Sequence, residues 1–181
     1  MHFFKVIKSV VNPILFSTIF VAAMVSCKSS KQNTSGKSSH PNTKVIKTDK
    51  VSEDKAQQVI TSARSYLGTH YKYGGTTKSG IDCSGLVCNS YKTIEITLPR
   101  TSTAQSEYGK PVKIGEVKEG DLLFFSDNKG GNKINHVGLV TEVKCNSVKF
   151  IHSTTKMGVI EDDLYSDYYH PRFVKAVRIL N

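Results

Sequence analysis

Hydrophobic residues follow three different patterns along the chain. Residues 14–25 are apolar apart from Ser17 and Thr18, residues 28–50 offer almost nothing to bury, and from residue 51 onward apolar residues recur at regular spacings. A helix rises about 1.5 Å per residue, so the first run is short for a hydrocarbon core about 30 Å thick. Because Lys5 and Lys8 precede it, this run is typical of an export signal.

The export signal ends in Met24-Val25-Ser26-Cys27, which resembles a lipobox, the bacterial signal that attaches lipid to a cysteine. Lipoboxes usually carry Leu three positions before the cysteine and Gly or Ala directly before it, so Met24 and Ser26 depart from the pattern. An ordinary cleaved signal is the alternative. We predict a lipoprotein signal peptide over residues 1–26, a lipid on Cys27, and a lipid-anchored disordered tether over residues 27–50.

The predicted location is therefore extracytoplasmic, on a bacterial membrane, and on the outer membrane facing the periplasm if the source has one. A net charge of +10 suggests a protein that binds nucleic acid, but the positive charge is concentrated near the N-terminus. Before residue 51, eight lysines face a single acid, Asp49, whereas the remaining 17 Lys and Arg face 14 Asp and Glu. Residues 51–181 therefore carry nearly equal numbers of basic and acidic residues, and we do not expect them to bind nucleic acid.

Residues 51–181 begin with helical spacing. Ser52 is a suitable helix cap, and the apolar residues that follow it recur at helical intervals until Gly68, namely Ala56, Val59, Ile60, Ala63 and Leu67. A second helix is predicted to begin at Asp82 or Cys83 and to continue through Tyr91. Residues 102–108 are expected to form a short helical turn.

Five later segments are rich in Val, Ile, Leu and Phe and predict strands. They span residues 121–126, 136–143, 148–153, 158–162 and 173–179. Helices followed by short strands indicate an α+β domain, with the N-terminal helices packed on a largely antiparallel sheet of about five or six strands. A chain of 181 residues accommodates one such domain and an appendage.

Cys83 is the first candidate for chemistry, because Asp82-Cys83-Ser84-Gly85 places a thiol where a loop becomes a helix. A helix N-terminus and a neighbouring imidazolium lower the pKa of a thiol from about 8.5, so that the thiolate is expected to dominate. Gly85 has no side chain, which lets another element or a substrate approach closely. A cysteine at a helix start is more often a packing residue, so this motif alone is weak.

A nucleophilic thiolate needs a base, and the base needs an orienting partner. His136 and His152 fall in consecutive predicted strands, whose connection turns near residues 145–147. Side chains alternate between the two faces of a strand. The two imidazoles therefore share a face only if the loop holds an odd number of residues or a bulge shifts the register.

Six blocks of sequence carry a resemblance to a known family. In order along the chain they are Gly68–Gly75, Ile81–Val87, Leu98–Ser102, Gly120–Phe125, His136–Gly138 and Ile151–Ser153. Together they resemble NlpC-type cell-wall peptidases, papain-like cysteine hydrolases of bacterial peptidoglycan peptides, over about residues 53–181. The resemblance extends to the leader, since small members are often lipid-anchored, single-domain enzymes. It implies a papain-like NlpC fold and an NlpC-type cysteine peptidase domain over residues 51–181.

The resemblance also implies a role for each residue of a catalytic centre. Cys83 would be the nucleophile, His136 the general base and acid, and His152 the polar residue that fixes the tautomer of the base. Tyr71 would face the nucleophile, where its hydroxyl and the Cys83 backbone amide stabilise the oxyanion.

Three further residues would bind substrate by the same resemblance. Asp82 and Ser84 would receive a cationic amine, with Arg100 nearby for a carboxylate. The alternative is that Asp82 only caps the helix and Arg100 makes a structural ion pair. In either case a carboxylate at Asp82 disfavours a thiolate nearby, so something must compensate for its charge.

The remaining cysteines match no catalytic block. We expect Cys88 and Cys145 to be small core residues, although a disulfide between them is conceivable outside the cytoplasm. A zinc site built from Cys83, Cys88, His136 and His152 lacks any CxxC or HxxxH spacing. No metal or other cofactor is predicted.

The predicted function is hydrolysis of amide bonds in peptidoglycan stem peptides or cross-links through a cysteine acyl-enzyme. The expected partners are peptidoglycan peptides and, through Cys27, a membrane, and the protein is expected to be a monomer. Two alternatives stay open. An acyl transferase or ester hydrolase would use the same thiol chemistry on the same fold. A catalytically silent wall-binding lipoprotein is the other, against which the intact Cys83, His136 and His152 weigh.

Overall fold

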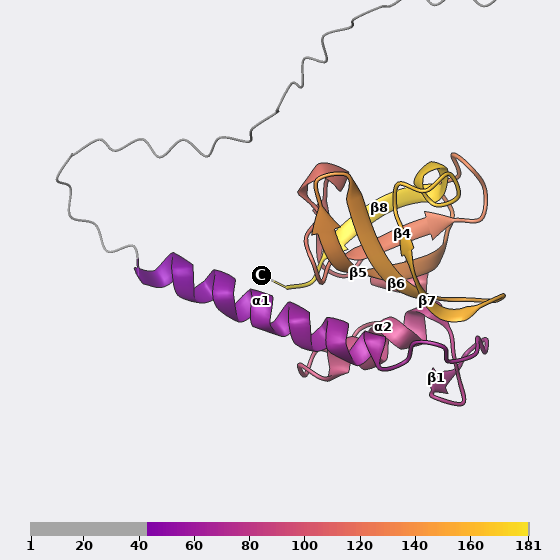
Figure 1. Ribbon diagram of the computed structural model, residues 1–181, viewed down its shortest axis with the longest axis horizontal. Helices are drawn as coiled ribbons and strands as arrows, with labels where there is room; N and C mark the ends of the chain where they lie inside the picture. Colours follow the sequence, from indigo (N-terminus) through magenta and orange to yellow (C-terminus); the bar gives the residue numbers. More distant parts are fainter. Residues whose placement is uncertain (1–42, 181) are drawn as a thin grey trace, which may run out of the picture. The chain divides into compact units, whose positions relative to one another are not determined.

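The computed structural model describes residues 43–180 of the chain (Figure 1). The predicted signal peptide, the lipidation site at Cys27 and most of the predicted tether lie outside the described residues. The helices are α1 (Thr43–Arg64), α2 (Cys83–Lys92) and the single-turn α3 (Ser102–Gln105). Two short 3-10 helices, η1 (Ile114–Glu116) and η2 (His170–Arg172), lie in connections between strands. No helix within residues 43–180 is both long enough and apolar enough to cross a membrane.

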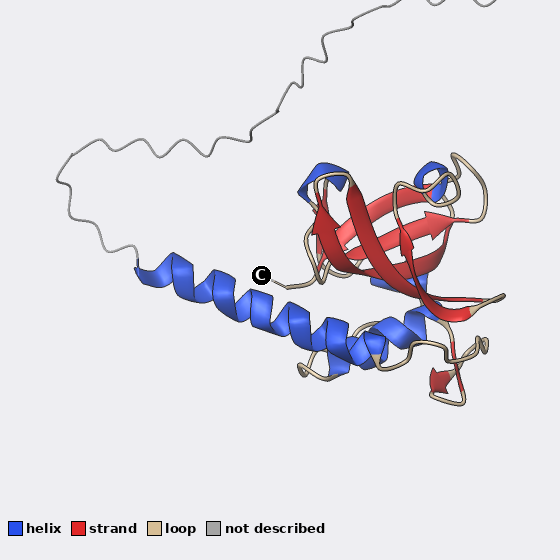
Figure 2. Cartoon of the chain, in the orientation of Figure 1, coloured by secondary structure: helices blue, strands red, loops and turns tan. Residues whose placement is uncertain are grey.

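Six strands form one antiparallel sheet in the order β3-β8-β4-β5-β6-β7 (Figure 2). Their bounds are β3 (Lys110–Val112), β4 (Leu122–Ser126), β5 (Ile134–Lys144), β6 (Ser147–Thr154), β7 (Gly158–Asp163) and β8 (Phe173–Arg178). The α+β class and the five strands predicted after residue 120 are therefore confirmed. The short β3 and a separate hairpin of β1 (Thr76–Thr77) and β2 (Gly80–Ile81) were not predicted, because two or three residues cannot display an alternating pattern.

Hydrophobic side chains pack on both faces of this sheet. On one face, Val59 of α1 and Leu86 of α2 are fully buried in a cluster that includes Phe124 of β4. On the other face, Phe125, the next residue of β4, joins a second cluster with Phe150. Figure 1 shows α1 and α2 on the same side of the sheet. Helix α2, which begins at Cys83, is thus held against the sheet by its own apolar residues.

Helix α1 begins earlier than predicted. It starts at Thr43, so the expected cap at Ser52 and the expected disorder of residues 43–50 are wrong. The sequence contains no Gly or Pro between Pro41 and Gly68, and nothing in this stretch opposes a helix strongly. From residue 49 onward, Ala56 is the first buried side chain of the helix, and residues 49–51 are exposed. The side chains of residues 49–51 are therefore not held by the core.

The hairpin of β5 and β6 decides where the two candidate histidines point. Its turn holds only two residues, since Lys144 pairs with Ser147. With this even turn, an unbroken ladder would put Leu139 opposite His152 and the imidazole of His136 on the opposite face.

A bulge at Thr141 changes that outcome. The register shifts between Val140 and Glu142, so Leu139 pairs with Ile151 instead. Continued by one residue, the shifted register puts Gly138 opposite His152, and His136 lies two residues further along on the same face. The requirement derived from the sequence is met by the bulge and not by the loop.

Candidate active site

Cys83 is the first residue of α2, as predicted, and Asp82 caps the helix. Asp82 has an extended backbone, and its Oδ1 accepts a hydrogen bond from the Gly85 backbone N–H at 2.7 Å. A Cβ atom at Gly85 would lie 2.5 Å from the Gly75 carbonyl oxygen, so only glycine lets that loop pack on the first helical turn. The Cys83 side chain is consequently enclosed and 7% exposed.

Asp82 and Arg100 form a bidentate ion pair beside the thiol. Arg100 Nη1 donates to Oδ1 at 2.9 Å and Nη2 donates to Oδ2 at 2.7 Å. The Ser84 hydroxyl donates to Oδ1 at 3.2 Å, and the Gly74 N–H donates to Oδ2 at 2.8 Å. Burial raises the pKa of Asp82, but the hydrogen bonds from Arg100 and the backbone outweigh burial and leave the pKa below its usual value. Arg100 thus supplies the compensating charge that the sequence required.

The two predicted histidines are in direct contact. His136 Nε2 lies 2.7 Å from His152 Nδ1, and the two rings meet edge to face with their centroids 5.0 Å apart. His152 is completely buried, whereas His136 is half-buried. Because Nε2 of His136 is engaged with His152, Nδ1 is the ring nitrogen of His136 left to take a proton from a thiol.

His152 has two further partners that the sequence analysis missed. Its Nε2 lies 3.0 Å from Asp162 Oδ2 and 3.4 Å from the Tyr169 hydroxyl. His152 pairs with Ile160 of β7, which places Asp162 two residues away on the same face. The hydrogen bond from His152 lowers the pKa of Asp162, which keeps the carboxylate charged. An acidic residue near the end of a strand has no distinctive sequence pattern, so register was the only signal that could have revealed it.

Cys83, His136 and Tyr71 line one pocket of about 230 Å³. A backbone bridge between Tyr71 and Ile81 fixes the tyrosine next to the loop that leads into α2. Burial raises the pKa of Tyr71, and the neighbouring Cys83 raises it further. The tyrosine hydroxyl therefore remains protonated and is able to donate a hydrogen bond into the pocket.

The resting site favours a neutral thiol beside a neutral imidazole. Burial is the largest effect on Cys83 and raises its pKa, Asp82 raises it further, and the backbone amide of Val137 lowers it without reversing the shift. Burial and the adjacent His152 lower the pKa of His136 to about 3. The prediction of a dominant thiolate is therefore wrong for the resting site, because enclosure penalises both charged forms.

The other two cysteines within the described residues are also free thiols, so Cys88 and Cys145 form no disulfide. Cys88 is half-buried, and its Sγ lies 3.2 Å from Gln105 Nε2. Cys145 is exposed, so the expectation that it lies in the core is wrong. It occupies the two-residue turn between β5 and β6, where a side chain projects into solvent.

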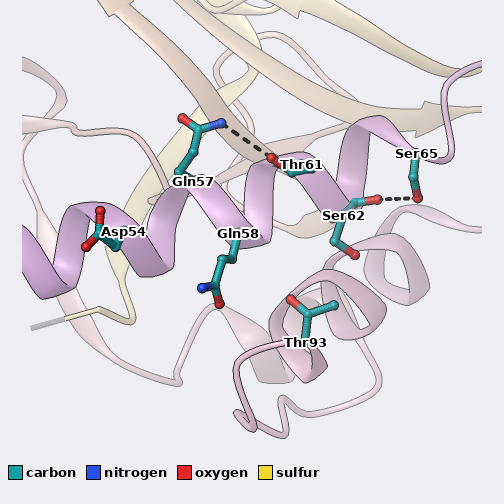
Figure 3. A pocket seen from close by; sticks show the side chains of 7 residues that line it. All are labelled: Asp54, Gln57, Gln58, Thr61, Ser62, Ser65 and Thr93. Carbon is teal, nitrogen blue, oxygen red and sulfur yellow. Dashed lines mark hydrogen bonds between the residues drawn. The ribbon is translucent and has the colours of Figure 1, made fainter.

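A larger hollow lies elsewhere, between α1 and the residue that follows α2 (Figure 3). The residues that line it all carry polar side chains, namely Asp54, Gln57, Gln58, Thr61, Ser62, Ser65 and Thr93. Gln57 donates to Thr61 within α1, and Ser65, the residue after α1, donates to the Ser62 carbonyl. The hollow contains neither a thiol nor an imidazole, so the smaller pocket at Cys83 is the candidate active site.

Comparisons with known proteins show related sequences. Over 178 residues, the chain is 29% identical to the murein DD-endopeptidase MepS/murein LD-carboxypeptidase of Escherichia coli strain K12, and the match covers 90% of each chain. It is 36% identical over 117 residues to the probable endopeptidase NlpC of the same strain, covering 64% of this chain and 73% of that protein.

The fold agrees with solved structures as well. An NlpC/P60 family protein from Bacillus cereus superposes with a TM-score of 0.64 at 31% identity. The match covers 70% of this chain but 40% of that protein, so this chain spans less than half of its length. The model of the NlpC/P60 family matches residues 68–178, which is more than half of the chain and includes Cys83, His136 and His152. This chain therefore belongs to the NlpC/P60 family.

Proposed function

We propose that this protein hydrolyses amide bonds in peptidoglycan stem peptides or their cross-links through a cysteine acyl-enzyme. The observation that carries the proposal is one pocket that holds the Cys83 thiol and His136, with His136 hydrogen-bonded to the buried His152. Related proteins named as a murein endopeptidase and a probable endopeptidase support the choice of substrate.

In the proposed mechanism, His136 Nδ1 takes the thiol proton as Cys83 Sγ attacks the amide carbonyl carbon. His136 then gives that proton to the leaving amine nitrogen, and a thioester with Cys83 remains. A water molecule attacks the thioester while His136 accepts its proton, which releases the carboxylic acid and restores the thiol. Because burial favours the neutral form of both groups, the attack requires transfer of the thiol proton to His136.

Asp162 and Tyr169 extend this site as positioning residues. A charged carboxylate only accepts hydrogen bonds, so Asp162 holds the proton of His152 on Nε2. His152 Nδ1 is then an acceptor, and His136 must donate from Nε2, which leaves the lone pair of its Nδ1 for the thiol proton. The chain of hydrogen bonds thereby selects the tautomer of His136 that acts as a base.

We assign oxyanion stabilisation to Tyr71 and the Cys83 backbone amide. Tyr71 lines the pocket with a protonated hydroxyl, and the Cys83 N–H belongs to the unpaired first turn of α2. For Asp82 and Arg100, the closed set of hydrogen bonds supports the structural alternative over the binding of a substrate amine by Asp82 and of a carboxylate by Arg100.

The experiment is to incubate the purified protein with defined muropeptides and to identify new amino termini by mass spectrometry. His136→Ala is expected to abolish cleavage, whereas His70→Ala, which changes an exposed histidine, is expected to retain it. Equal turnover by His136→Ala would refute the assignment. Trapping of the acyl group by hydroxylamine with other acyl donors, without cleavage of muropeptides, would favour the acyl transferase alternative.

We further propose that the protein is exported and anchored to a bacterial membrane by lipid on Cys27. The support is the apolar run after two lysines and its ending at a lipobox-like cysteine. Labelled palmitate should be incorporated into the full chain in cells and lost in Cys27→Ala. A Cys27→Ala chain that keeps its label and its membrane fraction would refute the anchor.

A further inference from the structure

Within residues 43–180, Arg172 differs from the other arginines in lacking an acidic partner. Arg64 pairs with Glu161 at 2.8 Å, Arg100 pairs with Asp82, and Arg178 pairs with Asp121 at 2.7 Å. These four are the only arginines of the chain. Among residues 43–180, Arg172 is the one arginine that makes no ion pair.

The guanidinium of Arg172 is nevertheless held in a fixed position. Its Nε donates to the Asp127 carbonyl at 3.2 Å, and its Nη1 donates to the Tyr168 carbonyl at 2.8 Å. Its Cζ lies 4.0 Å from the centroid of the Tyr168 ring, a cation–π contact. Of its five N–H groups, those of Nη2 and one of Nη1 have no partner within the described part of the chain. Nη1 and Nη2 of a pre-positioned cation therefore both retain N–H groups that can bind a ligand.

This cation lines the same pocket as the Cys83 thiol. The lining also includes Asp127, whose carboxylate makes no ion pair with Arg172, and uncharged polar residues such as Asn135 and Thr154. A guanidinium with free N–H groups on both Nη1 and Nη2 is suited to bind the oxygens of a carboxylate. Arg100, the residue for which the sequence predicted this role, is already engaged by Asp82.

We propose that Arg172 binds a carboxylate of the substrate and makes the enzyme discriminate between free and amidated stem peptides. This inference rests on the proposed function, because it names a carboxylate-bearing peptide as the ligand of that pocket. The fixed guanidinium lowers the ordering cost of binding, and a carboxamide, which is neutral, cannot replace the charge-assisted pair.

The test uses a series of otherwise identical stem peptides in which one carboxylate at a time is converted to a carboxamide. For the intact enzyme, one of these conversions is expected to lower kcat/KM by about tenfold, through KM. Arg172→Gln is expected to lower kcat/KM for the free acid by a similar factor and to remove the difference between that acid and its amide. Lys113→Gln, which removes an exposed cation that does not line the pocket, is the matched control and should keep the discrimination.

A second variant examines the acid in the pocket. Asp127→Asn removes a negative charge from the lining and should leave the preference for the free acid intact or increase it. Discrimination that is lost in Asp127→Asn but kept in Arg172→Gln would overturn the proposal.

Binding of the same peptides to Cys83→Ala, measured by calorimetry, separates this inference from the proposed function. Cleavage that is unaffected by Arg172→Gln for every peptide would overturn the inference and leave the hydrolase intact. Tighter binding of a free acid that depends on Arg172, without cleavage of any peptide by the intact enzyme, would uphold the carboxylate site and refute the hydrolase.

Discussion

Replacement of Asp162 by Asn removes the negative charge at the end of the imidazole chain while keeping the shape of the side chain. In the native site the carboxylate accepts a proton from His152, and His152 accepts one from His136. An amide either accepts or donates at this position, so the tautomer of His136 is no longer imposed. The same replacement removes the charge that favours His136 when it becomes positive during attack. We therefore expect kcat to fall with little change in KM.

The size of this loss follows from the geometry of the chain. The two hydrogen bonds are 2.7 and 3.0 Å long, and with the width of one imidazole ring they place the carboxylate about 8 Å from the ring that becomes charged. Charges about 8 Å apart interact by about 2 kcal/mol at an effective dielectric constant of about 20. The Asp162 side chain is 32% exposed, so solvent screening reduces the interaction to about 1–2 kcal/mol. The expected loss in kcat is about 5- to 30-fold.

The assay is turnover of a defined muropeptide, combined with ¹⁵N NMR of the histidine rings to report their tautomers. Asp163→Asn is the matched control, because Asp163 accepts hydrogen bonds from Ser147 and the Tyr165 N–H and does not contact His152. Thermal melts of both variants separate a folding defect from a catalytic one. A value of kcat within twofold of the native enzyme, with unchanged ¹⁵N signals, would refute the proposed role of the carboxylate.

Four further predictions follow from the same structure. Because burial raises the pKa of Cys83, its alkylation by iodoacetamide should still accelerate above about pH 9, after subtraction of the rate of Cys83→Ser; a plateau below neutral pH would indicate a preformed thiolate. Folding lowers the pKa of His136 from 6.5 to about 3, so between these pH values only the unfolded chain binds this proton. The free energy of unfolding should therefore decrease as the pH falls from 6.5 to about 3, and His136→Gln should make this decrease smaller. A Cβ at Gly138 would lie 2.4 Å from Phe150 Cδ2 and 3.4 Å from His152 Cβ. Gly138→Ala should therefore lower the free energy of unfolding by about 1–3 kcal/mol in a denaturant titration and lower kcat. Gly115→Ala is the control, because a Cβ there meets nothing within 4 Å. Arg100→Gln leaves the charge of Asp82 uncompensated and should lower kcat and thermal stability; a rise in KM alone would return Arg100 to the role of a substrate ligand.

The elements that position the site were predictable from local patterns. The strands at residues 121–126 and 148–153 follow from alternating or continuous apolar residues, and the start of α2 follows from Asp82 as a cap. Cys83 and His136 were first singled out by their places at the start of a predicted helix and in a predicted strand. These signals depend on each residue and its immediate neighbours, so they survive without any knowledge of what packs against them.

The start of α1 was not predictable in the same way. Capping propensity favoured Ser52, yet the helix extends back to Thr43. Helix propensity beyond the buried stretch is a sum of small local preferences, and a plausible cap does not end a helix when the residues before it also favour one.

The catalytic environment, in contrast, was decided by tertiary structure. The bulge at Thr141 shifts the strand register so that His136 and His152 lie on the same face of the sheet. The pairing of β6 with β7 places Asp162 beside His152. Enclosure of Cys83 reversed the expected direction of its pKa shift. By itself the sequence determined which residues carry the chemistry and on which elements they lie. Only the folded chain decided their charge, tautomer and partners, because strand register, burial and ion pairing depend on residues that are remote in sequence.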